Sequence, residues 1–420
     1  MSDVLHDLLN PIFADFWLRP ANEIDTDLAA LRQAGPTFHN EPVPPPNVPL
    51  PQGPGAWVLT RLEDILQVSK HAPDFSSASG VTVEHMPPEF LEYFTSIISL
   101  DDPKHQRLRK LVAKGFTPRM LAKLQDNVQH LATGIVDAIA ERGECDFVTD
   151  VAAALPLKIV CELMGIPDSQ YDFVFEQSNI ILGAGDPEYV PAGSDILTAI
   201  LNAGMALSEL MAEVIESKKG GDGDDLTTVL ANAEIDGERL SHQDIASFFI
   251  LLVVAGNETT RNATSWGLKY LTDNPDQRRI WLNDLDGVTP TAVEEIVRMA
   301  SPVTYMRRTL LTDETVSGVE MSAGDKVLMF YLAANRDPAV FVDPLTFDVQ
   351  RTPNNHVGFG GPGPHFCLGA HLARREIGVM FNELLRRLPD IHATEEPDLL
   401  HSSFIHGIKH LPASFTPVGR

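Results

Sequence analysis

The residues of this 420-residue sequence best suited to chemistry lie in a cysteine loop near its C-terminal end. The loop reads Phe359-Gly-Gly-Pro-Gly-Pro-His-Phe-Cys367-Leu-Gly369. A helical pattern follows from Leu368 to Leu388, with apolar residues at i, i+3, i+4 spacing. The N–H groups at a helix start lower the pKa of a thiol and stabilise its thiolate. Glycines allow tight turns and a close approach of backbone to a flat ligand. The loop therefore predicts a cysteine thiolate presented to a ligand.

Three interpretations of Cys367 are open at this point. It could be a small core residue, which is our interpretation of Cys161 in the apolar segment LKIVCELMG. It could join His365 and His371 in a zinc site, although structural zinc sites normally take four ligands. A core cysteine does not need several glycines, two prolines and two phenylalanines around it. The loop as a whole favours a thiolate that binds the iron of a haem.

A second polar motif interrupts the longest predicted helix. We expect this helix to be capped by Ser241 and Asp244 in a capping box and to end before Pro275. Its centre is apolar on every side, so it must be buried. The sequence Ala255-Gly-Asn-Glu-Thr-Thr260 breaks that apolar centre.

The break in this helix suggests a site for proton transfer. Gly256 weakens the hydrogen-bond ladder of the helix, and a neighbouring threonine hydroxyl can open it further. Glu258 and Thr259 could then relay protons to bound oxygen. They could also be ordinary polar residues that face other helices.

The cysteine loop resembles the haem-binding signature of the cytochromes P-450, Phe-Gly-x-Gly-x-His-x-Cys-x-Gly. One extra residue separates Phe359 from Cys367 here, so the local hydrogen bonds of the loop are expected to differ. The resemblance implies a mainly α fold with small β-sheets, in which a long central helix lies over the haem. It implies one domain over residues 1–420 with a β-rich portion at about 40–80. It also implies a monooxygenase that uses O₂ and carries haem b.

The same resemblance assigns roles to individual residues. Cys367 is the iron ligand, and Glu258 with Thr259 matches the family's acid–alcohol pair. Glu295 and Arg298, an i, i+3 pair, form an ionic cluster with Arg351 that holds the haem loop, although such a pair alone is usually a solvated surface pair. Further cofactor-binding residues are His105, Arg109, Ala255, Gly256, Arg308, Phe359, Gly360, His365 and Gly369. Four of them, His105, Arg109, Arg308 and His365, match partners of the haem propionates, and Arg307 is not excluded in place of Arg308.

The composition limits the classes of partner. The formal net charge is −26, from 58 acidic against 32 basic residues. Such a surface repels phosphate backbones and anionic membranes, so we expect no nucleic-acid partner. No uninterrupted apolar run reaches the roughly 20 residues of a membrane span. Three cysteines without paired spacing and no export signal predict a cytoplasmic protein.

One basic cluster stands out against this charge. Residues 101–123 carry Lys104, Arg107, Arg109, Lys110, Lys114, Arg119 and Lys123, and Arg374 and Arg375 follow the cysteine loop. If the two segments adjoin, an acidic ferredoxin supplied by its reductase could dock there. The alternative is an ordinary solvated helix face.

The substrate class rests on resemblance alone. The phrases AGNETTRNA, AVEEIVRMASPVTYMRRT, ANRDP and FIHGIKHLP look most like actinobacterial enzymes that hydroxylate a terminal methyl group of methyl-branched lipids, isoprenoids or sterol side chains. On that match Val303 and Phe404 line the substrate pocket, although Phe404 could be core packing. Residues 81–95 are a candidate loop over the entrance. The alternatives are a peroxide-driven enzyme, a haem-based sensor or lipid-binding module, and an oxidase of terpenoids or aromatic polyketides.

Overall fold

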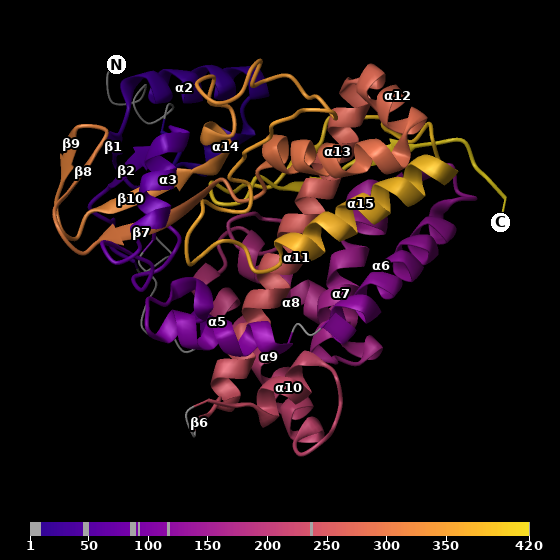
Figure 1. Ribbon diagram of the computed structural model, residues 1–420, viewed down its shortest axis with the longest axis horizontal. Helices are drawn as coiled ribbons and strands as arrows, with labels where there is room; N and C mark the ends of the chain where they lie inside the picture. Colours follow the sequence, from indigo (N-terminus) through magenta and orange to yellow (C-terminus); the bar gives the residue numbers. More distant parts are fainter. Residues whose placement is uncertain are drawn as a thin grey trace.

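The computed structural model describes residues 10–44, 50–84, 90, 93–115, 118–235 and 238–419, apart from the side chains of 114–115, 118–123, 125, 234–235 and 238. Helices make up most of the body and pack to one side of a small sheet (Figure 1). The mainly α fold with small β-sheets expected from the sequence is confirmed. The main helices are α2 (Ala21–Ala34), α3 (Leu62–Lys70), α5 (Lys104–Gly115), α6 (Pro118–Ile139), α7 (Ala154–Met164), α8 (Tyr171–Gly183), α9 (Ile196–Lys218), α10 (Leu226–Asn232), α11 (His242–Asp273), α12 (Pro275–Asn283), α13 (Leu285–Ala300), α14 (Tyr331–Ala334) and α15 (Ala370–Arg387).

The largest sheet collects strands from distant parts of the chain. Its order is β1 (Thr37–His39), β2 (Ala56–Leu59), β10 (Lys326–Phe330), β7 (Tyr305–Leu310) and β3 (Phe75–Ser76). Only the β10–β2 pair in this sheet is parallel. Strand β2 lies within the β-rich portion expected at about 40–80.

Smaller pairs of strands complete the β structure. They are β4 (Glu144–Asp146), β11 (His392–Ala393) and β14 (Pro412–Ser414) in one sheet, and the hairpins β5 (Glu234–Ile235)–β6 (Glu238–Arg239), β8 (Glu314–Val316)–β9 (Val319–Met321) and β12 (Asp398–Leu399)–β13 (Ile408–His410). The β12–β13 hairpin and the β11–β14 pair return the end of the chain to the helical body.

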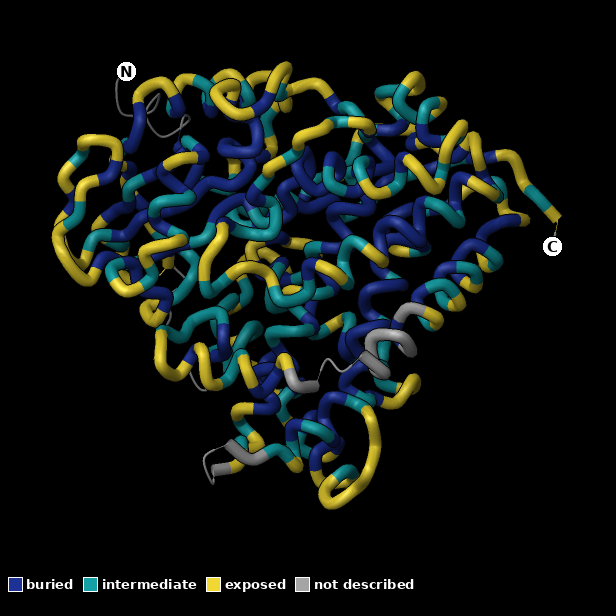
Figure 2. Tube along the Cα trace, viewed as in Figure 1, coloured by how far each residue is buried: buried dark blue, intermediate teal, exposed yellow. Residues whose placement is uncertain are grey.

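Helix α11 runs through the centre of the molecule, as its apolar sequence predicts (Figures 1 and 2). The Ser241 side chain accepts a hydrogen bond from the Asp244 N–H at 3.1 Å, and the Asp244 carboxylate accepts one from the Ser241 N–H at 3.0 Å. The predicted capping box and the end before Pro275 are therefore confirmed. The helix packs against α7, α8, α9, α13 and α15, so its polar centre is held inside the protein.

Helix α15 begins two residues later than the apolar pattern predicts. Gly369 caps it, and the loop residues Cys367 and Leu368 precede the first turn. The apolar face is buried as predicted, with every member of the set Ile377, Met380, Phe381, Leu384, Leu385 and Leu388 almost inaccessible. This face packs the helix on the core and leaves its N-terminus pointing toward α11.

The basic residues of the segment 101–123 lie on α5 and the start of α6. The Asp102 carboxylate accepts a hydrogen bond from the Gln106 N–H at 3.0 Å, as a capping residue does. Residues 116 and 117, between the two helices, lie outside the described residues. The candidate entrance loop at 81–95 also lies partly outside them.

Among the described helices, α9 is long and apolar enough to cross a membrane by length and composition. The sequence shows no uninterrupted apolar run there, because Thr198 and Asn202 divide the apolar residues of this helix. In this fold α9 packs against α8, α10 and α11, so its buried face belongs to the helical body.

Candidate active site

A pocket lies between the polar centre of α11, the cysteine loop and the first two turns of α15. Side chains from α7, α13 and β7 complete its wall. Apart from a small polar edge, the lining is apolar. Its members include Ile97, Ile98, Val160, Leu163, Phe248, Leu251, Leu252, Ala255, Gly256, Thr259, Thr260, Ala263, Val297, Val303, Met306, Phe359, Gly360, Cys367, Gly369, Leu372, Ala373, Glu376 and Ile377.

Cys367 faces this pocket from the loop. Its own N–H donates to the Phe359 carbonyl at 3.0 Å, which closes the loop despite the extra residue. Burial raises the pKa of the Cys367 thiol, while hydrogen bonds from the Gly369 and Ala370 N–H groups act in the opposite direction. The helix start thus acts on this pKa in the expected direction, although burial is the larger effect. A bound metal ion would supply the positive charge that a buried thiolate requires.

The glycines of the loop do two different things. A side chain on Gly363 would place its Cβ 2.1 Å from the Ser69 carbonyl oxygen, and one on Gly361 would meet the Ser69 side chain. These two glycines let the loop pack against the end of α3, and not against a flat ligand as the sequence suggested. Gly369 has nothing within 4 Å of that position, and it lies in the pocket wall. Gly369 thus leaves space over the sulfur.

Three residues predicted on α11, Ala255, Gly256 and Thr259, lie in the pocket wall. The Thr259 hydroxyl donates to the Ala255 carbonyl at 2.7 Å, the back-bond expected of a threonine that loosens a helix turn. A Cβ on Gly256 would come within 3.0 Å of Val160 on α7. Glycine at 256 therefore lets α7 and α11 approach closely at the height of Thr259.

Glu258 is turned away from the described pocket wall. Its carboxylate forms a buried ion pair with Arg261 on the next turn of α11, and Arg261 donates to the Asn179 side chain of α8 at 2.9 Å. Burial raises the pKa of Glu258, and Arg261 acts in the opposite direction. One carboxylate oxygen of Glu258 and both polar atoms of the buried Asn257 side chain have no protein partner. Polar atoms buried in this way are commonly satisfied by ordered water.

The polar edge of the pocket brings together residues from three parts of the chain. The rings of His105 and His365 lie 4.3 Å apart, and both belong to the pocket lining. Burial lowers the pKa of both histidines, that of His365 to about 3, so both are neutral at pH 7. The buried Nε2 of His105 has no protein partner, while His365 Nε2 lies 3.2 Å from the Ser77 hydroxyl.

Arg308 and Arg307 point to opposite sides of β7. Met306 faces the pocket, and Arg308 lies on the same face of the strand because side chains alternate. Its charge acts on His365 and Tyr331. Arg307 instead donates to the Thr82 and Glu84 carbonyls at 3.3 Å. The geometry therefore favours Arg308 over Arg307 as a group that faces the pocket.

Arg109 holds the cysteine loop directly. Its guanidinium donates to the Pro364 carbonyl at 2.9 Å and to the Phe366 carbonyl at 2.6 Å, and the residue lies in the pocket wall. Burial lowers the pKa of this group, and Cys367 acts in the opposite direction. Arg109, which is predicted to bind a propionate, thus also donates hydrogen bonds to the carbonyls on either side of His365.

These residues fit a haem. A cysteine sulfur faces the pocket, large apolar walls flank it, and the unpartnered His105 Nε2 with the nearby Arg308 and Arg109 supplies donors for carboxylates at one edge. The zinc alternative has no such support, since His371 is exposed and Cys367 belongs to no metal-type cluster in the described part of the chain. Cys161 is fully buried in α7, and burial raises its pKa to about 12, as expected for a core cysteine.

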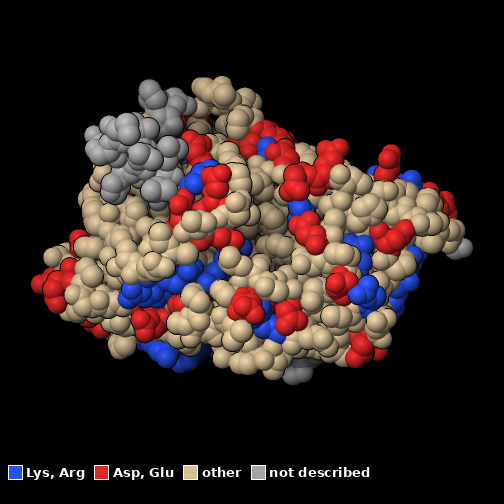
Figure 3. All heavy atoms as spheres, turned by 90° about the horizontal axis from the view of Figure 1, so that it is seen from above, with Lys and Arg blue, Asp and Glu red and all other residues tan. Residues whose placement is uncertain are grey.

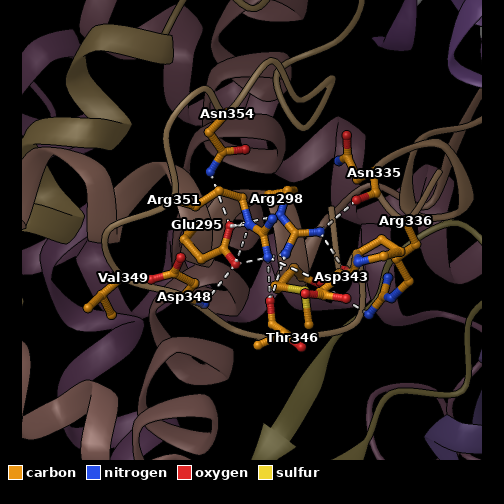
Figure 4. Close-up of polar contacts among 12 residues, drawn as sticks. Glu295, Arg298, Asn335, Arg336, Asp343, Thr346, Asp348, Val349, Arg351 and Asn354 are labelled. Carbon is orange, nitrogen blue, oxygen red and sulfur yellow. Dashed lines mark hydrogen bonds and ion pairs between the residues drawn. The ribbon is translucent and has the colours of Figure 1, made fainter. Parts of the chain in front are cut away.

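The Glu295 cluster lies outside the pocket and ties a long loop to α13 (Figure 4). Arg298 donates to both carboxylate oxygens of Glu295 at 2.7 Å, and Arg351 approaches the same oxygens at 3.1 Å. Arg298 also donates to carbonyls at Asn335 and Pro344. Both Glu295 and Arg298 are fully buried, so the pair is not the solvated surface pair that spacing alone allows.

The adjacent Glu294 has a role in the structure that sequence reasoning missed. Its carboxylate binds His356 at 2.8 Å and the guanidinium of Arg374, whose other face lies 4.3 Å from the Phe359 ring centre. Burial would raise the pKa of Glu294, but the hydrogen bonds from His356 and Arg374 outweigh burial and lower it to about 2. Glu294 therefore anchors both ends of the cysteine loop. The only signal in the sequence is the doublet of glutamates at 294–295.

The two predicted substrate-pocket residues separate in the structure. Val303 lies in the pocket wall and forms a bridge with Ile405. Phe404 lies outside the described lining and packs edge-on against Tyr305, with ring centres 5.4 Å apart. Phe404 thus supports the wall from behind, as its core-packing alternative suggested.

The family model described as Cytochrome P-450 matches residues 196–412, which is about half of the chain. The methyl-branched lipid omega-hydroxylase of Mycobacterium tuberculosis is 47% identical over 408 residues, covering 96% of this chain and 93% of the relative. The chain belongs to the cytochrome P-450 family. It is a monooxygenase of that family, whose cofactor is a haem iron.

Other relatives of this cytochrome P-450 agree. The steroid C26-monooxygenase of Mycobacterium tuberculosis is 38% identical over 396 residues, covering 93% of this chain and 89% of the relative. A Mycobacterium marinum cytochrome P-450, solved in complex with pseudoionone, superposes with a TM-score of 0.90 at 40% identity. The superposition covers 96% of this chain and 97% of that chain, so the likeness extends well beyond the residues of the family match.

Proposed function

We propose that this cytochrome P-450 hydroxylates a terminal methyl group of a methyl-branched fatty acid, isoprenoid or sterol side chain. The observation that carries the proposal is the position of Cys367, which faces an apolar pocket whose opposite wall holds Gly256 and Thr259. The relatives named for omega-hydroxylation of branched lipids and for C26 oxidation of steroids support this substrate class. Another terpenoid or a polyketide is the second candidate, favoured by the pseudoionone complex of a 40% identical protein.

The cofactor is proposed to be haem b, and the sulfur of Cys367 would bind its iron. When bound, the haem supplies the activation of O₂ and the transfer of one oxygen atom to a C–H bond. Arg308, Arg109, His105 and His365 would hold its propionates, and Phe359, Gly360 and Gly369 would pack on its sulfur side. Neutral histidines beside an arginine suit this task because imidazole N–H groups can donate to carboxylates without further buried charge.

Thr259 and Glu258 are proposed to deliver protons to the reaction. The Thr259 hydroxyl lies in the pocket wall, where it would hold and pass on a proton once it releases the Ala255 carbonyl. Glu258, one residue away but turned toward Arg261, would supply protons through ordered water in the buried polar cluster. Val303, Leu251 and Phe248 would hold the hydrocarbon chain, since no charged side chain stands among them.

Electrons are proposed to arrive from a ferredoxin, reduced by its reductase. Lys104, Arg107 and Lys110 are exposed on α5, and Arg109 of the same helix binds the cysteine loop. The α5 face therefore adjoins the loop, as a docking patch requires. Arg374, which the sequence placed in this patch, is half-buried and held by Glu294. The side chains of Lys114, Arg119 and Lys123 lie outside the described residues.

The test of this function begins with the iron ligand. Cys367→Ser should give protein without the thiolate-type carbon monoxide spectrum, with Cys161→Ser as the matched control that keeps it. If the spectrum survives in Cys367→Ser, the ligand assignment is wrong.

The substrate class is tested by optical titration and product analysis. The wild-type protein should bind methyl-branched fatty acids more tightly than straight chains of equal length, and should oxidise them at the branched end. Mass spectrometry of the product locates the hydroxyl group. Tighter binding of an unbranched or aromatic compound, with oxidation elsewhere, would favour the second candidate.

A further inference from the structure

Glu376 is a buried acid that the proposed reaction does not use. It lies in the second turn of α15 and is 3% exposed. Its helix carries it on the same face as Gly369, Leu372 and Ala373, all in the pocket wall. Seven residues separate Gly369 from Glu376, which is about 10 Å along a helix. The carboxyl therefore lies in the same pocket as the Cys367 sulfur without contacting the loop.

Glu376 is also the one carboxyl group in the described pocket lining. Glu258 is not part of that lining and is paired with Arg261. The α11 residues in the wall, Thr259, Thr260 and Ala263, carry no charge, and α13 contributes Val297. The other ionisable groups in the lining are His105, Arg109, Tyr331, His365 and Cys367.

Among the residues whose side chains the structure describes, no cation forms an ion pair with this carboxyl. Burial alone raises the pKa of Glu376 to about 8, and no charged neighbour contributes to the shift. Two basic residues precede it on α15: Arg375 is exposed, and Arg374 is held by Glu294. Burial lowers the pKa of His105 and His365, so both imidazoles stay neutral above pH 7. At neutral pH Glu376 is therefore mostly a neutral acid that can lose a proton at little cost.

We propose that Glu376 is a proton-exchanging residue of the pocket, which takes up a proton from water when an electron reaches the site. This inference rests on the proposed binding of haem by Cys367. An added electron brings one negative charge into a pocket of low polarity, and a neighbouring carboxylate would repel it. If the added charge lies roughly 10 Å from the carboxyl, the repulsion at an effective dielectric constant of about 20 would raise the pKa of Glu376 by about one unit. Glu376 then binds one proton for each electron in the pH range between its pKa before reduction and its pKa after reduction.

The experiment measures the reduction potential of the haem-loaded protein from pH 6 to pH 10. The wild-type potential should fall as the pH rises through the range around 8 and level off at both ends. Glu376→Gln, which is neutral at every pH and similar in shape, should remove this fall. Glu383→Gln should keep it, because this glutamate of the same helix is paired with Arg387 and is not part of the described pocket lining. Infrared difference spectra of oxidised and reduced wild-type protein at pH 8 should show a protonated carboxyl band that Glu376→Gln lacks.

Two outcomes would overturn the proposal. One is a wild-type potential that does not change across this pH range, a result that needs no variant. The other is the same fall in Glu376→Gln as in the wild-type protein. The reduced carbon monoxide spectrum, recorded at each pH, separates these outcomes from a failure of the haem assignment. A missing thiolate-type spectrum would count against Cys367, while a normal spectrum with a flat potential counts against Glu376 alone.

Discussion

At the scale of single residues, two neighbours on α11 are turned to different surroundings. Thr259 faces the pocket, while Glu258 is buried in an ion pair with Arg261. Adjacent residues of a helix point about 100° apart, so the two side chains can meet different surroundings. This difference predicts different effects of their substitution.

Thr259→Ala should keep substrate binding but lose coupling. Without the hydroxyl, electrons are consumed and hydrogen peroxide is released in place of hydroxylated product. Glu258→Gln should lower overall turnover with coupling largely retained, because it slows the supply of protons. The measurements are NADH consumed, peroxide formed and product formed, with Thr264→Ala on the same helix as the control. Wild-type coupling in Thr259→Ala would refute its role and favour a peroxide-driven enzyme.

Glu376 gives a prediction on stability at the same scale. Its pKa is about 8 in the folded protein against 4.5 for the ordinary group, so between these values the folded state holds a proton that the unfolded state has lost. This group therefore lowers the free energy of unfolding by about 1.4 kcal/mol per pH unit as the pH rises from 4.5 to 8. Its contribution is constant below and above that window.

The check compares wild-type protein with Glu376→Gln by denaturant unfolding at pH 5 and pH 8. Between pH 5 and pH 8 the wild-type protein should lose up to a few kcal/mol of its free energy of unfolding relative to Glu376→Gln. An equal difference at both pH values would show that the carboxyl is not buried as a neutral acid.

At the scale of elements, ionic contacts fix the loops on either side of Cys367. Glu295 and Arg298 bind the loop between β10 and α15 to α13, and Glu294 holds Arg374 and His356 around Phe359. Two consecutive glutamates of one helix thus serve different parts of that loop. The position of the sulfur depends on both, although neither glutamate lies in the pocket wall.

Glu295→Ala should destabilise the protein by roughly 3–5 kcal/mol, because it leaves Arg298 buried without its partner. Asp286→Ala on the same helix is the matched control, since it removes an exposed pair with Arg386 and should cost at most about 1 kcal/mol. Haem content and melting temperature check the prediction. Equal losses in the two variants would contradict a special role for the buried cluster.

At the scale of the whole molecule, charge separates the surface into different regions. Acidic side chains are spread over the face in Figure 3, with basic groups between them. The net charge of −26 makes an exposed basic helix such as α5 exceptional. Electrostatic steering of an acidic partner toward such a face raises the rate of encounter and weakens with salt.

Reversal of charge at Lys104 and Lys110 should slow turnover driven by a ferredoxin and reduce its dependence on salt. Turnover driven by peroxide should be unchanged, because it bypasses the electron donor. Lys219→Glu, after α9, is the control at an equally exposed site. An equal loss by both routes would indicate damage to the fold or the haem site, and would refute the docking patch.

The sequence by itself determined the chemistry and the local elements of this protein. Cys367 in its loop, the capped α11 and the amphipathic α15 could be predicted because each depends on neighbours within a few residues. The family resemblance then named most of the residues that gather at the pocket. The type of residue that could bind the iron and the bounds of a helix are local properties, which a single segment of sequence can indicate.

Only the tertiary structure decided which side chains face the pocket and which are held elsewhere. Arg308 could be distinguished from Arg307, and Val303 from Phe404, once strand β7 and its neighbours were placed. The tertiary fold also buries the Glu258–Arg261 pair, binds Arg261 to Asn179 of α8, and places Glu376 in the pocket wall. These outcomes depend on contacts between residues far apart in the chain and on burial, which sets the pKa values. Neither long-range contacts nor burial can be predicted from the spacing of residues within one segment.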